Sequence, residues 1–305
     1  MADGSTKVVY AALTGNLLVA FSKFAAAWLS GSSAMLTEAI HSAADTINQV
    51  LLLIGTKRSR ARADASHAFG YGMEVYFWTF VVAVIVLLAG GVASIWQGVA
   101  ELDSPHAIRS PLVSLGVLVL AGVFEGSSFA VGYREFKRQV AGRKFRGKPV
   151  GMWRFIKLSK DPNLYESLLE DSAALIGIGI AAVGVIASAY LHALWADGAA
   201  SIAIGVLLIA DSLVIAQATR SLVAGESVTP HVLAEIRRLL KEAPNPPEVA
   251  EIKTLHLGPR TIIVTLTLAR NAGKAEANLE KTLRDTAERV RAADPRIKFV
   301  YFGFE

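Results

Sequence analysis

Long apolar runs occupy most of the chain, each near the twenty residues that a helix needs to cross about 30 Å of hydrocarbon. Short polar segments separate six such runs, which predicts an all-α bundle of six transmembrane helices. The runs cover 8–28, 33–55, 76–99, 112–132, 164–190 and 193–216. No secretory signal pattern precedes the first run, so we expect a protein that is inserted into a membrane and not secreted.

The pattern changes beyond residue 222, where charged and apolar positions mix and proline and glycine are frequent. Helical periodicity and strand-like alternation follow one another along this tail. The predicted elements are a helix at 230–240, strands at 251–257 and 260–269, a helix at 276–292 and a strand at 298–305. The order predicts a small α+β domain with two helices on one face of a sheet. We therefore divide the chain into a membrane domain, 1–222, and a cytosolic domain, 223–305.

Charge adds an orientation to this topology. Lysine and arginine gather in the segments after the second and fourth runs, whereas the alternate loops carry only Arg109. We therefore expect both termini in the cytosol, and we attribute the net charge of +5 to this bias and not to nucleic-acid binding. The basic segments could also meet anionic lipid headgroups. Cysteine is absent, so any metal site must use histidine and carboxylates.

Ionisable residues inside a membrane are costly and are functional candidates by default. The second run carries the densest set, with spacings of three and four residues that place them on one helical face. These residues are Glu38, His41, Asp45, Asn48 and Gln49. His41 and Asp45, four residues apart, can present an imidazole nitrogen and a carboxylate to one ion, and both ligand types suit Zn²⁺.

The fifth run supplies the expected partner helix, with Glu166, Ser167, Glu170 and Asp171 near its cytosolic end. Two helices that face each other with carboxylates make a cation site. Glu166 could instead lie at the membrane interface in contact with water, and Glu170 could be a neighbour of the site or a member of it. We expect the other polar residues of the spans to be interhelical partners and not ligands. They are Asn16, Lys23, Glu125 and Asp211.

Three segments carry a resemblance to the cation diffusion facilitator family, closest to the branch that contains the mitochondrial-type zinc transporter nine. They are SGSSAMLTEAIHSAADTINQ at 30–49, HAFGYGMEVY at 67–76 and LLEDSA at 168–173. The resemblance implies a homodimer that exchanges a cytosolic divalent cation for protons, with a ferredoxin-like or metallochaperone-like cytosolic domain. It also implies a metal site between the second and fifth helices, with His41, Asp45 and Asp171 in ligand positions.

The chain departs from the family pattern at two sites. The fourth ligand position, usually histidine, is Ser167, so Glu170 or a water would complete an oxygen-richer site that also tolerates Mn²⁺ or Fe²⁺. The loop site between the second and third helices keeps Asp64 and His67, but Tyr71 replaces its second histidine. Ser167, Glu38, Asp64 and His67 are therefore kept as further candidates for metal binding.

We thus expect a proton-coupled transporter of divalent cations, with Zn²⁺ as its ion and no resident cofactor, and not an enzyme. A manganese, iron or cobalt transporter of the same family, an organic-cation transporter, and a membrane scaffold that has lost transport are the alternatives. A scaffold gives no reason to retain His41, Asp45 and Asp171 at their cost in lipid. For the host membrane we expect the bacterial plasma membrane.

Overall fold

A computed structural model describes residues 2–140, 144–145, 148–149, 151, 162–243, 248–269 and 279–305. The chain forms two compact units. The first contains the residues up to Gly55 together with Trp78–Ala218, and the second contains Thr56–Phe77 and Thr219–Glu305. The loop after the second predicted span therefore belongs to the same compact unit as the tail, whereas the sequence assigns it to the membrane domain. The boundary at residue 222 stays a prediction.

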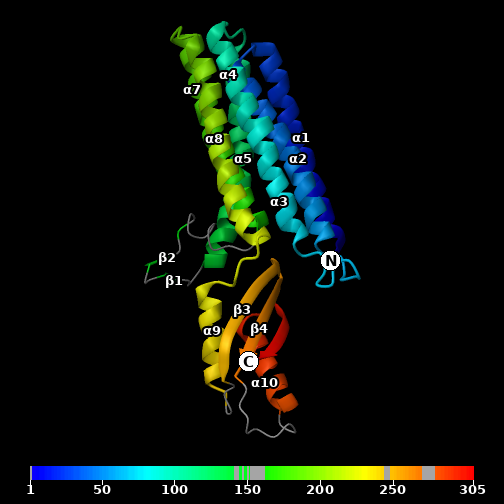
Figure 1. Cartoon of the computed structure of the whole chain (residues 1–305). Helices are drawn as coiled ribbons and strands as arrows, with labels where there is room; N and C mark the ends of the chain where they lie inside the picture. The colour runs from blue at the N-terminus through cyan, green and yellow to red at the C-terminus, as the bar shows by residue number, and fades with distance from the viewer. Residues whose placement is uncertain are drawn as a thin grey trace. The chain divides into compact units, whose positions relative to one another are not determined.

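Long helices that run side by side build the first unit (Figure 1). They are α1, Ala2–Ser30; α2, Ser33–Arg58; α3, Glu74–Ile85; α4, Ala93–Asp103; α5, Pro111–Val140; α7, Pro162–Tyr190; and α8, Trp195–Val223. A π-helical turn, η1, Val86–Val92, joins α3 to α4 without a break. Two-residue strands β1, Lys144–Phe145, and β2, Lys148–Pro149, pair within the basic segment.

Four helical segments of the described ranges are long and apolar enough to cross a membrane. They are Glu74–Asp103, Pro111–Arg138, Tyr165–Tyr190 and Trp195–Val223, and they coincide with the last four predicted spans. The first two predicted spans are also long helices, of 29 and 26 residues. The polar face of α2 lowers its mean hydropathy, so length and composition alone do not mark it as a span. The structure therefore supports a helical membrane unit, and the number six stays a prediction.

Small residues let helices of the first unit approach closely. A Cβ added to Gly98 of α4 would lie 2.6 Å from the carbonyl oxygen of Gly198 in α8, and one added to Gly198 would lie 2.9 Å from the carbonyl oxygen of Gly98. Real side-chain carbons do not tolerate such distances, so glycine is required at both positions. Small residues at this contact thus allow α4 and α8 to pack closely, as is common between membrane helices.

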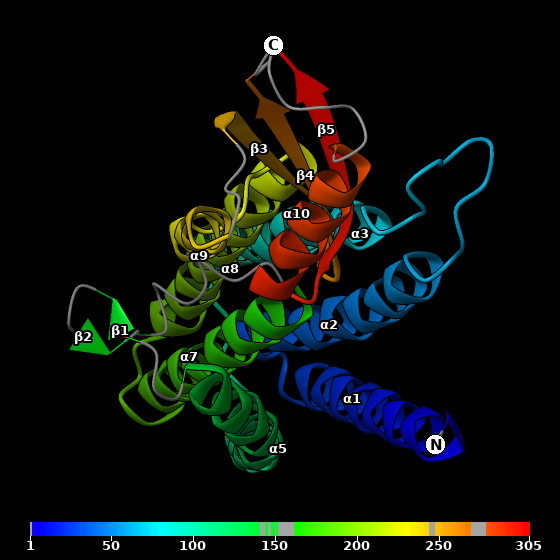
Figure 2. The same cartoon turned by 90° about the horizontal axis from the view of Figure 1, so that it is seen from below.

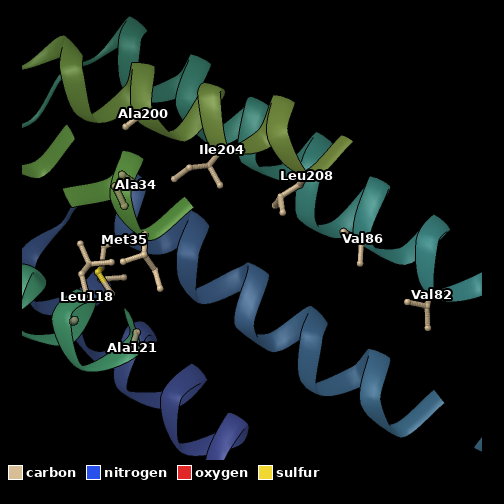
Figure 3. Close-up of a cluster of buried hydrophobic side chains, with 13 residues drawn as sticks. Ala34, Met35, Val82, Val86, Leu118, Ala121, Ala200, Ile204 and Leu208 are labelled. Carbon is tan, nitrogen blue, oxygen red and sulfur yellow. The ribbon is translucent and has the colours of Figure 1, made fainter. Parts of the chain in front are cut away.

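An apolar core joins α1, α2, α3, η1, α5, α7 and α8. Ala34 and Met35 of α2 lie among Leu118 and Ala121 of α5, while Ile204 of α8 lies nearby in the same cluster (Figure 3). Met35 and Ile204 are completely buried. One side of α2 is thus fixed by apolar packing, which leaves its polar face for other contacts.

The second unit contains the tail, whose order of helix, two strands, helix and strand is the predicted one. Its elements are α9, Pro230–Lys241; β3, Val249–Gly258; β4, Thr261–Leu268; α10, Leu279–Ala293; and β5, Ile297–Phe304. The sheet order is β3-β4-β5, with β3 antiparallel and β5 parallel to β4. Residues 276–278 of the predicted second helix lie outside the described ranges.

Both tail helices cover the same face of the sheet (Figure 2). The alternate residues of β4, Ile262, Val264, Leu266 and Leu268, are buried and pack in one cluster with residues of α9 and α10. Period-two alternation of buried and partly exposed positions is what a sheet with one covered face requires. In the same unit, Phe69 of the loop packs edge-on against Phe299 of β5, at 5.4 Å between ring centroids.

Candidate metal site

The polar face of α2 points into the first unit. Glu38 and Asn48 are completely buried, His41 is 1% exposed and Asp45 is 7% exposed. The i, i+3 and i+4 spacing predicted one face, and the structure buries that face as predicted. Buried polar groups need partners, so the partners decide what each of these residues can do.

Glu38 is held by a lysine. Lys23 of α1 donates to Glu38 Oε2 at 2.9 Å and to the Ser42 hydroxyl at 2.7 Å, and both charged side chains are completely buried. Gly177 of α7 makes room for the other oxygen, because a Cβ there would lie 2.5 Å from Glu38 Oε1. Lys23 is therefore an interhelical charge partner, as the sequence indicates, and it neutralises the carboxylate that was a further candidate for metal binding.

His41 and Asp45 lie together one helical turn apart. His41 Nδ1 is 3.3 Å from Asp45 Oδ1, the arrangement expected for two ligands of one ion. Within the described part of the chain, both ring nitrogens of His41 and the Oδ1 oxygen of Asp45 are buried without a well-formed hydrogen bond. Neither residue is therefore held by a complete set of protein partners.

Glu170 of α7 reaches this face across the helix interface. Asn48 Nδ2 donates to Glu170 Oε1 at 3.0 Å. The carboxyl groups of Asp45 and Glu170 lie within hydrogen-bonding reach of one another. Two carboxylates that lie within hydrogen-bonding reach of one another repel each other unless a cation or a proton lies between them. Glu170 is thus the residue of α7 that meets the candidate residues of α2.

Asp171 and Ser167 take other positions. Asp171, which is 8% exposed, accepts a hydrogen bond of 2.9 Å from Ser128 of α5. Ser167 is half-buried. Glu166, for which the sequence left a solvated position at the interface open, is only 1% exposed, and its Oε1 has no hydrogen bond among the described residues. The structure therefore turns Asp171 toward α5 and buries Glu166.

No group of three or more histidine, aspartate and glutamate side chains in the described ranges stands close enough to enclose a metal ion. What the structure does bring together is two pairs, His41 with Asp45 within α2 and Asp45 with Glu170 of α7. Sequence reasoning noted Asn48 on the polar face but missed its bond to Glu170. Its position three residues after Asp45 was the available signal.

A comparison with known protein families matches residues 9–222 to the cation efflux transmembrane domain. The match covers most of the chain, including α2 and α7. The chain belongs to the cation diffusion facilitator family. The predicted family is thereby confirmed, and the helices of this facilitator form a multi-pass membrane domain.

Curated relatives with similar sequences include transporters that are named for different metals. The facilitator is 31% identical over 255 residues to the human proton-coupled zinc antiporter SLC30A9, mitochondrial, a match that covers 84% of this chain and 44% of the relative. It is 30% identical over 259 residues to metal tolerance protein C4 of Arabidopsis thaliana, covering 84% of this chain and 55% of the relative.

A more distant relative, the manganese efflux system protein MneP of Bacillus subtilis, is 23% identical over 236 residues, covering 77% and 74% of the two chains. The facilitator spans about half the length of the zinc antiporter and of the metal tolerance protein that it matches. The first of these relatives is mitochondrial by name, so the host membrane stays a prediction.

In this facilitator, the residues at the family's loop site form hydrogen bonds with one another. Asp64 Oδ1 accepts bonds from the backbone of Ser66 at 2.9 Å and of His67 at 2.8 Å, and Tyr71 donates its hydroxyl to Asp64 Oδ2 at 2.7 Å. The His67 and Tyr71 rings stack at 3.9 Å. The Tyr71 hydrogen bond, followed by the bond from the His67 backbone, lowers the pKa of Asp64, and the same carboxylate raises the pKa of Tyr71.

Proposed function

We propose that this facilitator moves a divalent transition metal ion, zinc first, across the membrane in exchange for protons. The observation that carries the proposal is the set of His41 and Asp45, buried with polar atoms that lack hydrogen bonds, opposite the Glu170 carboxylate. Burying such groups costs free energy unless a partner arrives. A cation that binds imidazole nitrogen and carboxylate oxygen is a partner of the right chemistry, and zinc prefers these ligands.

The ligand set proposed here contains His41, Asp45, Glu170 and Asp171. Because Asp171 bonds to Ser128 in this conformation, it would have to turn from α5 toward α2 to reach the ion. A shell with one nitrogen and several oxygens also suits Mn²⁺, Fe²⁺ or Co²⁺. Manganese is therefore the second candidate, because Glu170 would supply a carboxylate oxygen in place of the histidine nitrogen that the family pattern has at position 167, three residues earlier on α7.

Proton exchange follows from the chemistry of the ligands. An imidazole or a carboxyl group must lose its proton before it binds a metal, so metal and protons compete for the same atoms. The human relative is named a proton-coupled zinc antiporter, which agrees with this mechanism. A site that opens alternately to the two sides would release protons where it takes up metal.

The proposed architecture is a homodimer in which each chain spans the membrane six times and has both termini in the cytosol. Its support is the family resemblance, the long helices α1 and α2 beside the four apolar segments, and the lysine and arginine distribution of the loops. The alternative of a membrane scaffold predicts no ion flux.

Uptake of Zn²⁺ and Mn²⁺ into proteoliposomes with an imposed pH gradient tests the proposal. We expect flux that depends on the gradient, and its loss in D45N, which removes a negative ligand with almost no change in volume. The matched control is D103N, the same chemical change at an exposed position at the end of α4. Full transport by D45N would contradict the site, and absence of flux for every transition metal would favour the scaffold.

A further inference from the structure

Of the carboxylates at the polar face of α2, Glu38 and Glu170 are held by different donors. Glu38 is bonded by the ammonium group of Lys23 at 2.9 Å, whereas Glu170 is bonded by the amide of Asn48 at 3.0 Å. An ammonium group cancels the charge of its partner and repels a second cation. A neutral amide fixes the position of a carboxylate and leaves its charge available.

The orientation of the Asn48 amide follows from its partner. An ionised carboxylate only accepts hydrogen bonds, so the NH₂ end of Asn48 must face Glu170 and the Oδ1 end must point away. Asn48 is completely buried, and its Oδ1 has no hydrogen bond among the described residues. The bond to Glu170 is therefore the contact that explains this buried side chain.

We propose that Asn48 is a positioning residue that sets the metal preference of the site by holding Glu170 beside Asp45. The inference rests on the proposed function. With Glu170 fixed, the shell gains a carboxylate oxygen and favours ions that prefer oxygen, such as Mn²⁺. Without Asn48, Glu170 is free to turn away from Asp45, which repels it when the site is empty. The shell then keeps His41 and Asp45, the pair that suits Zn²⁺ best.

Calorimetric titration of the purified full-length protein with Zn²⁺ and with Mn²⁺ at one pH tests this inference. Partners that orient metal ligands typically change affinity by about 10–100-fold. In N48L, which keeps the branched shape of the side chain and removes the donor, we expect Mn²⁺ affinity to fall by about tenfold or more and Zn²⁺ affinity by less than about threefold. N48S, whose short side chain cannot reach Glu170, carries the same expectation if N48L does not fold.

If Asn48 had a merely structural role, the effect of N48L on metal affinity would not depend on Glu170. In an E170A background, N48L should cause no further loss for either metal, because the residue through which it acts is gone. Equal losses in both backgrounds, or unchanged affinities in N48L, would overturn the inference. The variant D45N distinguishes a failure of this inference from a failure of the proposed function. If D45N bound metal as tightly as wild type, the proposed metal site itself would be wrong.

Discussion

Polar groups at the two ends of the buried stretch of α2 differ in how completely they are hydrogen-bonded. At its first turn, Asp197 of α8 accepts a hydrogen bond of 2.6 Å from the Ser32 hydroxyl and further bonds from the backbone amides of Ser33 and Ala34. Ser32 in turn accepts a bond of 3.1 Å from the Met35 amide. The amides at the start of α2, which have no partner within the helix, are thus satisfied by a side chain and by a neighbouring helix.

Two turns further along, the same helix carries His41 and Asp45, which retain buried atoms without hydrogen bonds in the described part of the chain. The difference teaches how to separate structural from functional polar groups in a membrane bundle. Groups with complete partner sets stabilise the fold, while groups with incomplete sets cost stability and await a ligand. Substitutions at the two places should therefore change stability and metal affinity in opposite patterns.

The largest effect on stability is expected at the first turn. Asp197→Ala removes the acceptor of three bonds and leaves the amides of Ser33 and Ala34 without it, which should cost about 2–4 kcal/mol of unfolding free energy. Thermal unfolding in detergent measures the loss. Zinc affinity by calorimetry should stay within about threefold of wild type. Asp197→Asn, which keeps one acceptor oxygen, is the milder control. A zinc affinity that falls in parallel with stability would remove the distinction between the two regions.

A smaller effect of opposite sign is expected at the metal site. The double substitution His41→Leu with Asp45→Leu replaces incompletely bonded polar groups by apolar ones, which should raise the unfolding free energy of the metal-free protein by about 1 kcal/mol. Wild type should gain thermal stability when Zn²⁺ is added, since a ligand that binds the folded state stabilises it. The double variant should lose that gain. Lower stability of the double variant without metal would show that these side chains hold the fold together.

Periodicity explains why much of this architecture was predictable. The spacing of Glu38, His41, Asp45 and Asn48 defines a face of a helix whatever the neighbours are, and the alternation along 260–269 defines the buried face of β4. The carboxylates near the cytosolic end of the fifth run then pointed to α7 as the partner helix of α2. These inferences depend on local sequence, and the structure agrees with them.

Contacts between helices depend on the rotation of each helix about its axis, which one sequence does not encode in a readable spacing. Asp197 lies more than 160 residues from the amides that it bonds, and nothing near it in the sequence indicates this. Similarly, α7 carries Glu170 and Asp171 side by side, and only packing decides that Glu170 meets Asn48 while Asp171 meets Ser128. The burial of Glu166 follows from the same packing.

The smallest effect is expected in the loop, where the polar groups are satisfied but exposed. Tyr71 is the largest cause of the lowered pKa of Asp64, so Tyr71→Phe should raise that pKa toward the ordinary value of 3.8. A carboxylate whose pKa is lowered by folding stabilises the folded loop above its unfolded pKa, near 3.8, and the contribution disappears as the pH falls through the lower folded value.

Titration of ¹³C-labelled aspartate by NMR measures the shift, with Tyr190→Phe, an exposed tyrosine at the end of α7, as the control. Because Asp64 and Tyr71 are exposed, the thermal stability of the whole protein at neutral pH should not change. An Asp64 pKa that is equal in wild type and Tyr71→Phe would mean that the Tyr71 hydroxyl does not hold this carboxylate in solution. The Asp64 carboxylate would then be as available to a cation as the Asp45 carboxylate of α2.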